Sequence, residues 1–161
     1  MKTYAGIGSR ETPTDILIQM AEIAKYLDNR DYTLRSGGAQ GADTAFSKGA
    51  GNGFNKLEQQ IFTADSCTNE AEYLASKFHP NWNACKPYVR RLMGRNAMII
   101  LGRLLDDKVD FVICWTKDGK DSGGTGHALR IAQDRNINIY NLFFEKRRDM
   151  MERMVRCDTM L

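Results

Sequence analysis

Short apolar segments alternate along the chain with longer segments in which apolar residues recur every three or four positions. The first apolar run, residues 4–7, predicts a strand. The segment after it predicts a helix over residues 13–29, because its apolar residues recur at helical spacing: Ile16, Met20, Ile23 and Leu27. The alternation continues to the end of the chain. Further strands are expected at residues 32–35, 57–62, 110–115 and 137–142, and further helices at residues 41–50, 69–77, 86–105, from 124 onward and at the basic C-terminus.

Several of these elements carry more detailed expectations. Thr12 is placed to cap the first helix, with Pro13 at its first helical position. In the weak third strand only Ile61 and Phe62 are expected to be buried. The helix over 86–105 is expected to bury one apolar stripe that ends at Leu104. The nearly continuous apolar run at 110–115 is typical of a central parallel strand buried on both faces.

Strands that alternate with helices through short loops predict an α/β fold. We expect one domain, residues 1–161, with a Rossmann-like parallel sheet of about five strands and helices on both faces. In such a fold ligands bind beyond the carboxyl ends of the strands, where the strand order reverses.

Composition narrows the class of protein. Among 161 residues, 42% are hydrophobic and 27% charged, and no segment approaches the roughly 20 apolar residues that span a bilayer. The first strand begins too early for a secretory signal, so a cytoplasmic protein without a membrane partner is expected. The net charge of +3 is compatible with an anionic ligand but does not require one.

The four cysteines are scattered and are expected to be reduced thiols. Cys67, His79 and Cys85 could converge on zinc, but their spacing is irregular, so no metal and no cofactor is expected.

Three glycine-rich segments fall at predicted strand ends: residues 6–10, 36–43 and 122–126. Glycine allows the backbone to approach a ligand closely, and free N–H groups at a following helix start favour an anion such as phosphate. Strand-to-helix turns also need glycine for their own geometry, and that alternative remains for each segment alone. From these segments we expect ligand contacts by Gly8, Ser9, Arg10, Ser36, Gly37, Gly38, Gln40, Asp43, Gly123, Gly124, Thr125 and Gly126.

Other side chains extend this candidate site. Arg10, Arg35 and Arg95 are the cations expected nearest to it, with Asn96 beside Arg95. Asp43 would either bond a sugar hydroxyl or cap its own helix. Trp115 could stack on a base, although an aromatic residue at a strand end also suits a core. Neither the P-loop pattern nor the complete G-x-G-x-x-G fingerprint is present.

The glycine-rich segments, together with Gly94-Arg95-Asn96, resemble the superfamily that joins the Lonely Guy proteins with DNA-processing protein A, usually called SLOG. The resemblance covers residues 4–142, is most specific at residues 34–43, and is strongest to small stand-alone DprA-like proteins, which are often found in phages and bacteria. It implies the same Rossmann-like fold.

The resemblance implies three functions. Lonely Guy enzymes are phosphoribohydrolases that cleave the N-glycosidic bond of nucleoside monophosphates with an arginine, matched by Arg95, and a glutamate, whose position holds Arg130 here. Asp118 and Asp121 lie in the preceding loop and could substitute for that acid. DNA-processing protein A binds single-stranded DNA, and other members sense or sequester nucleotide-derived signals.

The sequence therefore favours a protein that binds a nucleotide or nucleotide-derived ligand. A nucleotide N-glycosidase in which Arg95 is catalytic and a single-stranded DNA-binding recombination mediator remain the alternatives. Relatives commonly form homodimers, and Met150, Met151 and Met154 could supply a homo-oligomer interface unless they pack on their own sheet.

Overall fold

Five parallel strands form the centre of the protein in the computed structural model, which describes residues 1–159. Their spatial order is β3-β2-β1-β4-β5, so the order reverses between β1 and β4. The expected α/β, Rossmann-like parallel sheet is confirmed. The strands are β1 (Lys2–Gly6), β2 (Tyr32–Ser36), β3 (Gln60–Ile61), β4 (Phe111–Cys114) and β5 (Asn138–Asn141).

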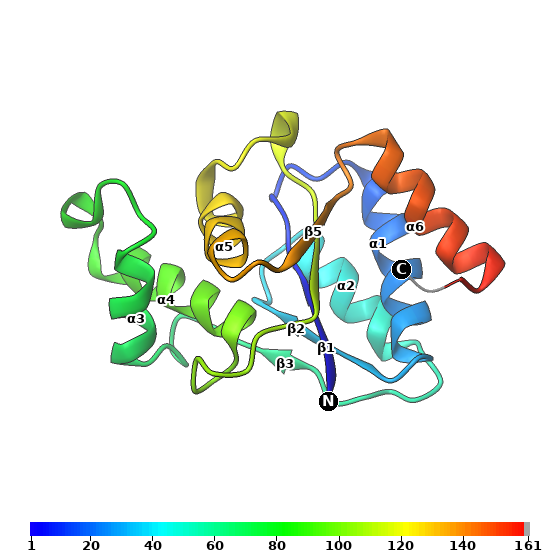
Figure 1. Cartoon of the computed structure of the whole chain (residues 1–161), viewed down its shortest axis with the longest axis horizontal. Coiled ribbons are helices and arrows are strands. Elements are labelled where there is room, and N and C mark those ends of the chain that lie inside the picture. The colour runs from blue at the N-terminus through cyan, green and yellow to red at the C-terminus, as the bar shows by residue number, and fades with distance from the viewer. Residues whose placement is uncertain (160–161) are drawn as a thin grey trace.

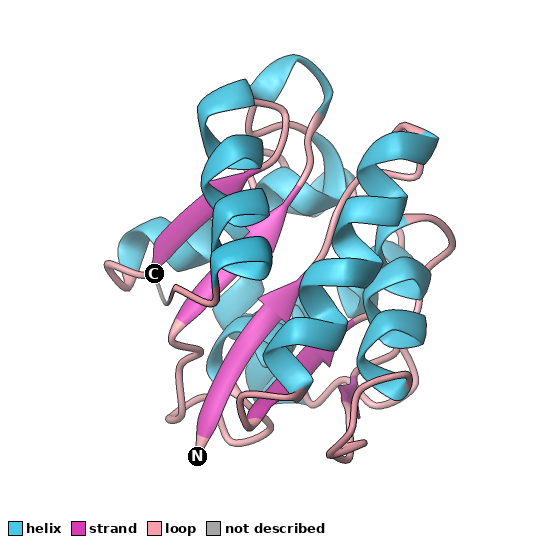
Figure 2. Cartoon of the chain, turned by 90° about the vertical axis from the view of Figure 1, so that its right-hand side faces the viewer, coloured by secondary structure: helices cyan, strands magenta, loops and turns pink. Residues whose placement is uncertain are grey.

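Six α-helices flank the sheet in the described part of the chain, three on each side (Figure 1). On one side are α1 (Thr14–Asp28), α2 (Ala42–Gly51) and α6 (Glu145–Cys157). On the other are α4 (Pro87–Leu101), α5 (Gly123–Asp134) and α3 (Asn69–Ser76), which packs on α4. Figure 2 shows the strand arrows running in the same direction between these two layers. The sheet therefore has one edge at which all carboxyl ends meet.

Alternate strand residues face opposite layers, and this produces two hydrophobic cores. Tyr4 and Ile113 pack with α1, α2 and α6, whereas Ala5 and Val112 pack with α4 and α5. All four residues of β4 are buried, as expected for a central strand.

The helix expected over residues 86–105 ends earlier than predicted. Gly102 follows the last residue of α4 with φ = 79°, a conformation that favours glycine, and its N–H bonds to the carbonyl of Met98. The chain turns there, so Leu104 is 78% exposed instead of buried. A helical apolar pattern cannot show that the backbone leaves the helix before its last apolar member.

The third strand is shorter than predicted because Asp28 holds the segment before it. The buried carboxylate of Asp28 accepts hydrogen bonds from the backbone N–H groups of Asn55, Lys56 and Leu57. Only Gln60–Ile61 then pairs with β2. Phe62 is buried as expected, but the Ile61 side chain is partly exposed, contrary to expectation.

The start of the first helix differs from the expectation, and the packing of the last helix follows one of the two alternatives left open. Pro13 lies at the N-cap of α1, because the Thr12 hydroxyl bonds to the carbonyl of Ser9 instead of capping the helix. Met151 and Met154 of α6 pack in the core of their own chain, which is the alternative that the sequence left open to an interface with a second copy, and Met150 is half-buried.

Candidate functional site

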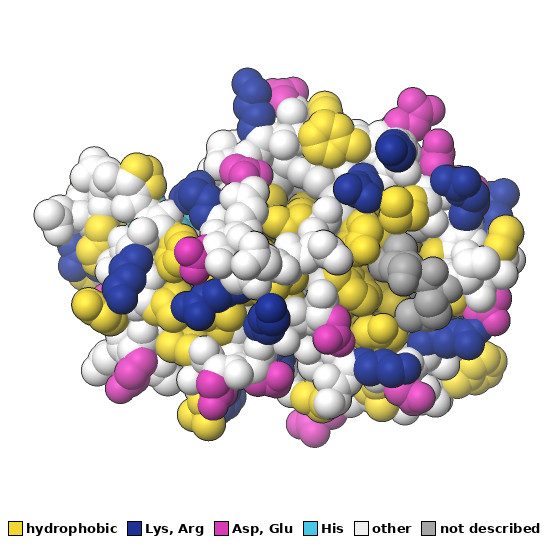
Figure 3. All heavy atoms as spheres, in the orientation of Figure 1, with side chains coloured by type: hydrophobic (Ala, Val, Ile, Leu, Met, Phe, Trp, Pro, Cys, Tyr) yellow, Lys and Arg dark blue, Asp and Glu magenta, His cyan; other side chains and the backbone are white. Residues whose placement is uncertain are grey.

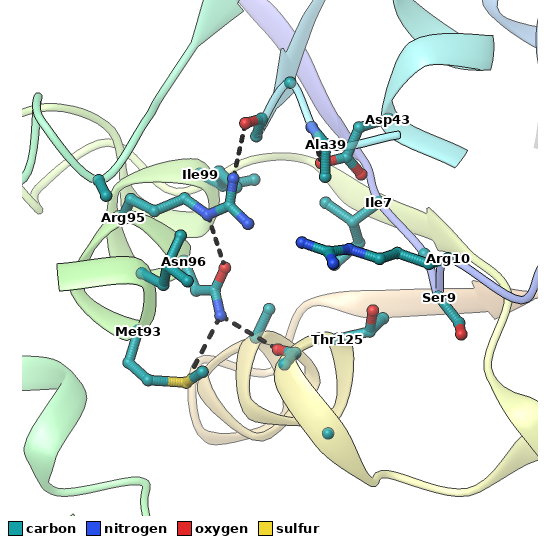
Figure 4. A pocket seen from close by; sticks show the side chains of 18 of the residues that line it. Ile7, Ser9, Arg10, Ala39, Asp43, Met93, Arg95, Asn96, Ile99 and Thr125 are labelled. Atoms are coloured by element: carbon teal, nitrogen blue, oxygen red, sulfur yellow. Dashed lines mark hydrogen bonds between the residues drawn. The ribbon is translucent and has the colours of Figure 1, made fainter. Parts of the chain in front are cut away.

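A cavity of about 640 Å³ lies at the carboxyl edge of the sheet. The loop after β1, the loop after β2 and the start of α5 meet there, and α4 forms the opposite wall (Figure 4). This is the region beside the reversal of strand order where open parallel sheets bind ligands. The cavity is lined by Ile7, Gly8, Ser9, Arg10, Gly37, Gly38, Ala39, Asp43, Thr63, Ala64, Tyr88, Leu92, Met93, Arg95, Asn96, Ile99, Ser122, Gly123, Gly124, Thr125 and Ala128.

The loop after β1 is fixed by its backbone. The N–H of Ser9 donates to the carbonyl of Trp115, and the carbonyl of Ser9 accepts from the N–H and hydroxyl of Thr12. Gly8 is tightly enclosed, since a Cβ there would lie 2.6 Å from the Cβ of Ala42. The glycine therefore lets this loop pack against the start of α2, which sets the position of Arg10.

Arg95 reaches across the cavity from α4. Its Nη1 donates to the carbonyl oxygen of Gly37 at 2.6 Å, and its Nε donates to Oδ1 of Asn96 at 3.3 Å. Burial lowers the pKa of Arg95, with Asp43 and Tyr88 opposing and Arg10 adding to that shift. The lowered pKa indicates that the charged guanidinium of Arg95 is partly desolvated.

Asn96 and His127 hold this arginine in orientation. The Asn96 amide Nδ2 donates to the carbonyl of Gly124 at 3.1 Å and lies 3.5 Å from Nδ1 of His127. His127 Nε2 lies 3.0 Å from the carbonyl of Ala75, which can only accept, so the proton is on Nε2 and Nδ1 is an acceptor. Burial lowers the pKa of His127 to about 4, so the ring is neutral at pH 7. These bonds turn the Asn96 oxygen toward Arg95.

Asp43 connects the first two glycine-rich loops. Its Oδ2 accepts the N–H of Ala39 at 3.1 Å, and backbone N–H groups of Gly37 and Gly8 also bond to the carboxylate. Burial raises the pKa of Asp43, while these N–H groups and Arg95 act in the opposite direction. Asp43 lies in the first turn of α2, yet its recorded partners belong to the preceding loops and not to its own helix. It thus fixes the position of the loops around the cavity.

The electrostatic character of the cavity is cationic. Arg10 and Arg95 point toward each other from opposite walls (Figure 4), and Asp43 is the one carboxylate among the lining residues. The first turn of α5 also faces the cavity, and Ser122 at its N-cap makes no side-chain capping bond. Uncapped N–H groups and two guanidinium groups opposed by one carboxylate favour an anion.

Most of the sequence-predicted site residues line this cavity, and four do not. Ser36 is buried and donates its hydroxyl proton to the carbonyl of Gly6, whereas Trp115 is 8% exposed and packs on Phe143 in the opposite core. The remaining two are Gln40 and Gly126, which also lie outside the lining.

Two arginines named in the sequence analysis lie outside the cavity. Arg35 was expected near the site, but its guanidinium is buried and bonds to Asp107 and to the Gln60 amide. Arg130, which the resemblance aligns with the glutamate of Lonely Guy enzymes, donates to the carbonyls of Phe78 and Asp121 and does not line the cavity.

The sequence reasoning missed the apolar part of the wall. Thr63 and Ala64 follow the weak third strand, where no motif points to them. The missed α4 residues could have been found, because three of them fall at helical spacing from Arg95: Tyr88, Leu92 and Ile99.

The cysteines and histidines of residues 1–159 form neither a metal site nor a disulfide. His79 and Cys85 lie together, with Sγ 3.6 Å from Nε2, but no group of three His, Cys, Asp or Glu residues in this range could hold a metal ion. All four cysteines are free thiols. None of the helices within these residues has the length and apolar character needed to span a membrane.

Fold and site together define an α/β protein of Rossmann-like topology with a cationic cavity at the carboxyl edge of its sheet. No protein-family model, curated protein or solved structure matches the chain.

Proposed function

We propose that the protein binds a nucleotide or nucleotide-derived molecule in this cavity, with a phosphate group between Arg10 and Arg95. The observation that carries the proposal is the approach of these two guanidinium groups from opposite walls, with Asp43 as the single carboxylate among the lining residues. Bringing two like charges together is unfavourable unless an anion joins them, and phosphate oxygens suit the planar guanidinium group.

The remaining walls suit the rest of such a molecule. The first turn of α5 offers backbone N–H groups and the Thr125 hydroxyl, which can bond phosphate or ribose oxygens. The loops after β1 and β2 bring Ser9 and the backbone of Gly37 and Gly38 to the same space. The resemblance to SLOG proteins, drawn from the same loops, implies the same class of ligand.

A binding panel tests this proposal. The four nucleoside monophosphates, cyclic AMP, NAD and ADP-ribose would be titrated against the protein, together with ribose 5-phosphate and inorganic phosphate, by calorimetry and thermal unfolding. At 100 times Kd a ligand stabilises the fold by about 2.7 kcal/mol, which is a shift of several degrees. If no member of the panel binds, the proposal is wrong.

A matched pair of variants connects binding to the site. Arg95→Gln removes a charge that lines the cavity, whereas Arg153→Gln removes the same charge from α6, where the side chain is exposed. Loss of a charge-assisted hydrogen bond costs about 1.5–3 kcal/mol, or roughly a ten- to hundredfold loss of affinity. Only Arg95→Gln should show it.

A second candidate is hydrolysis of the N-glycosidic bond of a nucleoside monophosphate, and Asp43 is the observation that favours it. The position expected to hold the family's acid is Arg130, outside the cavity, whereas Asp43 places a carboxyl group in the wall on which Arg95 acts electrostatically. Hydrolysis adds water across the bond, and such a group could accept the proton of that water. Free base released from the nucleotide, and lost in Asp43→Asn, would support this candidate.

No continuous basic surface favours single-stranded DNA on the face shown in Figure 3. There, Lys and Arg side chains are interspersed with Asp and Glu side chains. Binding of DNA would require a track of positive charge along the backbone and would weaken steeply with salt. An oligonucleotide therefore belongs in the binding panel as a contrast to the small ligands.

A further inference from the structure

One face of α4 runs along the cavity from its rim to its floor. Tyr88, Leu92, Arg95 and Ile99 follow one another at intervals of four, three and four residues, and all four line the cavity, as does Asn96 beside Arg95. Residues at this spacing share one side of a helix. Tyr88 is exposed at the start of this face, whereas Asn96 and Ile99 are buried at its end. The wall therefore begins with an exposed aromatic ring and continues past Arg95 and Asn96 to a buried apolar residue.

Tyr88 presents an unoccupied aromatic ring at this rim. The residue is 65% exposed, and within residues 1–159 no aromatic ring or cation packs against its ring. Tyr73, which is similarly exposed on α3, differs because Lys77 Nζ lies 4.7 Å from its ring centroid. The large apolar surface of Tyr88 thus faces solvent at the mouth of a cationic cavity.

The neighbours of Tyr88 extend this surface inward. Leu92 lies one turn further along α4, Met93 follows it, and both are half-buried in the cavity wall. Met93 side-chain atoms also reach toward the opposite wall, where a Cβ at Gly124 would lie 3.9 Å from Met93 Cε. A flat ring and a flexible thioether together suit a planar ligand group.

We infer that Tyr88, Leu92 and Met93 form a subsite for a nucleobase, whose face stacks on the Tyr88 ring while its phosphate lies between Arg10 and Arg95. The inference rests on the proposed function and adds the base as a recognised part of the ligand. Seven residues separate Tyr88 from Arg95, which is about 10 Å along the helix axis. The aromatic and cationic parts of the wall therefore contact different ends of one ligand. Trp115, buried in the opposite core, does not take this role.

Comparing a nucleotide with its base-free counterpart tests the subsite. Adenosine monophosphate, the other three nucleoside monophosphates and ribose 5-phosphate would be titrated calorimetrically against the wild-type protein, Tyr88→Ala and Tyr88→Phe. Base–aromatic stacking predicts that Tyr88→Ala weakens the best-bound monophosphate by roughly 5- to 150-fold. Binding of ribose 5-phosphate should be unchanged, and Tyr88→Phe should behave like the wild type because the ring is kept. Tyr73→Ala is the matched control outside the cavity.

Three outcomes would overturn the inference. If Tyr88→Ala leaves nucleotide affinity unchanged while Arg95→Gln reduces it, the cavity binds phosphate and Tyr88 does not stack, so the proposed function stands without the base subsite. If Tyr88→Phe loses as much affinity as Tyr88→Ala, the phenol hydroxyl and not the ring makes the contact. If no monophosphate binds the wild-type protein, both the subsite and a nucleoside monophosphate as ligand are wrong.

Discussion

Arg95 Nη1 donates to the carbonyl oxygen of Gly37 at 2.6 Å, although 58 residues separate them in the sequence. The bond joins α4 to the loop after β2 and holds a guanidinium group in the cavity. It requires glycine, because a Cβ at position 37 would overlap Arg95 Nη1 and lie 2.9 Å from Asp43 Oδ2. The position of the Arg95 guanidinium therefore depends on the absence of a side chain at Gly37, directly after β2.

Gly37→Ala should displace Arg95 without unfolding the protein. The nearest group in the way is the far end of the flexible Arg95 side chain, so the fold can adapt while the guanidinium leaves its binding position. We expect nucleotide affinity to fall roughly tenfold or more, close to the effect of Arg95→Gln. Gly51→Ala, near the end of α2 where the nearest atom is 3.7 Å away, is the control. Equal affinities in the two alanine variants would show that Gly37 does not position Arg95.

Asp43→Asn should separate phosphate binding from fold stability. The substitution removes the carboxylate that accepts N–H groups of both glycine-rich loops, so the free energy of unfolding should fall by about 1–3 kcal/mol. It also removes the one negative charge of the cavity wall, so inorganic phosphate should bind more tightly. Chemical denaturation and phosphate titration measure the two effects. Weaker phosphate binding would contradict the electrostatic account of this cavity.

His127 should make stability depend on pH. Its pKa is about 4 in the folded protein, against 6.5 for the ordinary group, so the unfolded chain takes up the proton first as the pH falls. The unfolded state therefore gains stability between pH 6.5 and about 4, and the free energy of unfolding should decrease by on the order of 3 kcal/mol across this window.

Denaturation of two histidine variants checks this pH dependence. His127→Gln should lose the part of the slope above pH 4.5 that the wild type shows, whereas His79→Gln should keep most of it. His79 is the appropriate control because it is the other histidine of the chain and its ring lies 6.3 Å from that of His127. If the pH dependence of the unfolding free energy persists in His127→Gln, it arises from other titratable groups.

Asp28→Ala should destabilise the protein without affecting the cavity. Three backbone N–H groups, those of Asn55, Lys56 and Leu57, would lose their charged acceptor, at a cost of about 3 kcal/mol. Glu22→Ala, on the exposed side of the same helix, should change stability by less than about 0.5 kcal/mol. Because Asp28 does not line the cavity, both variants should bind nucleotide as the wild type does. Reduced affinity in Asp28→Ala would show that the β3 segment shapes the site.

The fold could be predicted from the sequence because its apolar periodicity is strong and local. The run at 110–115 became a strand buried on both faces, and alternation of elements fixed the parallel sheet. The glycine-rich loops were correctly brought to one edge, since parallel strands share their carboxyl end.

The features that could not be predicted from the sequence depend on hydrogen bonds between residues far apart in the chain. Arg35 leaves the site because Asp107, 72 residues away, accepts its hydrogen bonds, and the third strand is shortened by Asp28. Nothing in the sequence around Asp107 or Asp28 indicates that its carboxylate bonds to these distant groups. Which strand face holds Trp115 depends on register, and its ring packs with Phe143 in the core instead of lining the cavity. The spacing between Tyr88 and Arg95 could have placed Tyr88 in the cavity wall, but the sequence could not show that Tyr88 is exposed there.

The central claim is that Arg10 and Arg95 bind the phosphate of a nucleotide. Calorimetric titration of the wild-type protein, Arg95→Gln and Arg153→Gln with the nucleoside monophosphates, with free base followed in the same samples, tests it most directly. The account predicts saturable binding to the wild type and to Arg153→Gln, a loss of roughly ten- to hundredfold in Arg95→Gln, and no released base. Equal binding in all three proteins, or no binding to the wild type, would contradict it.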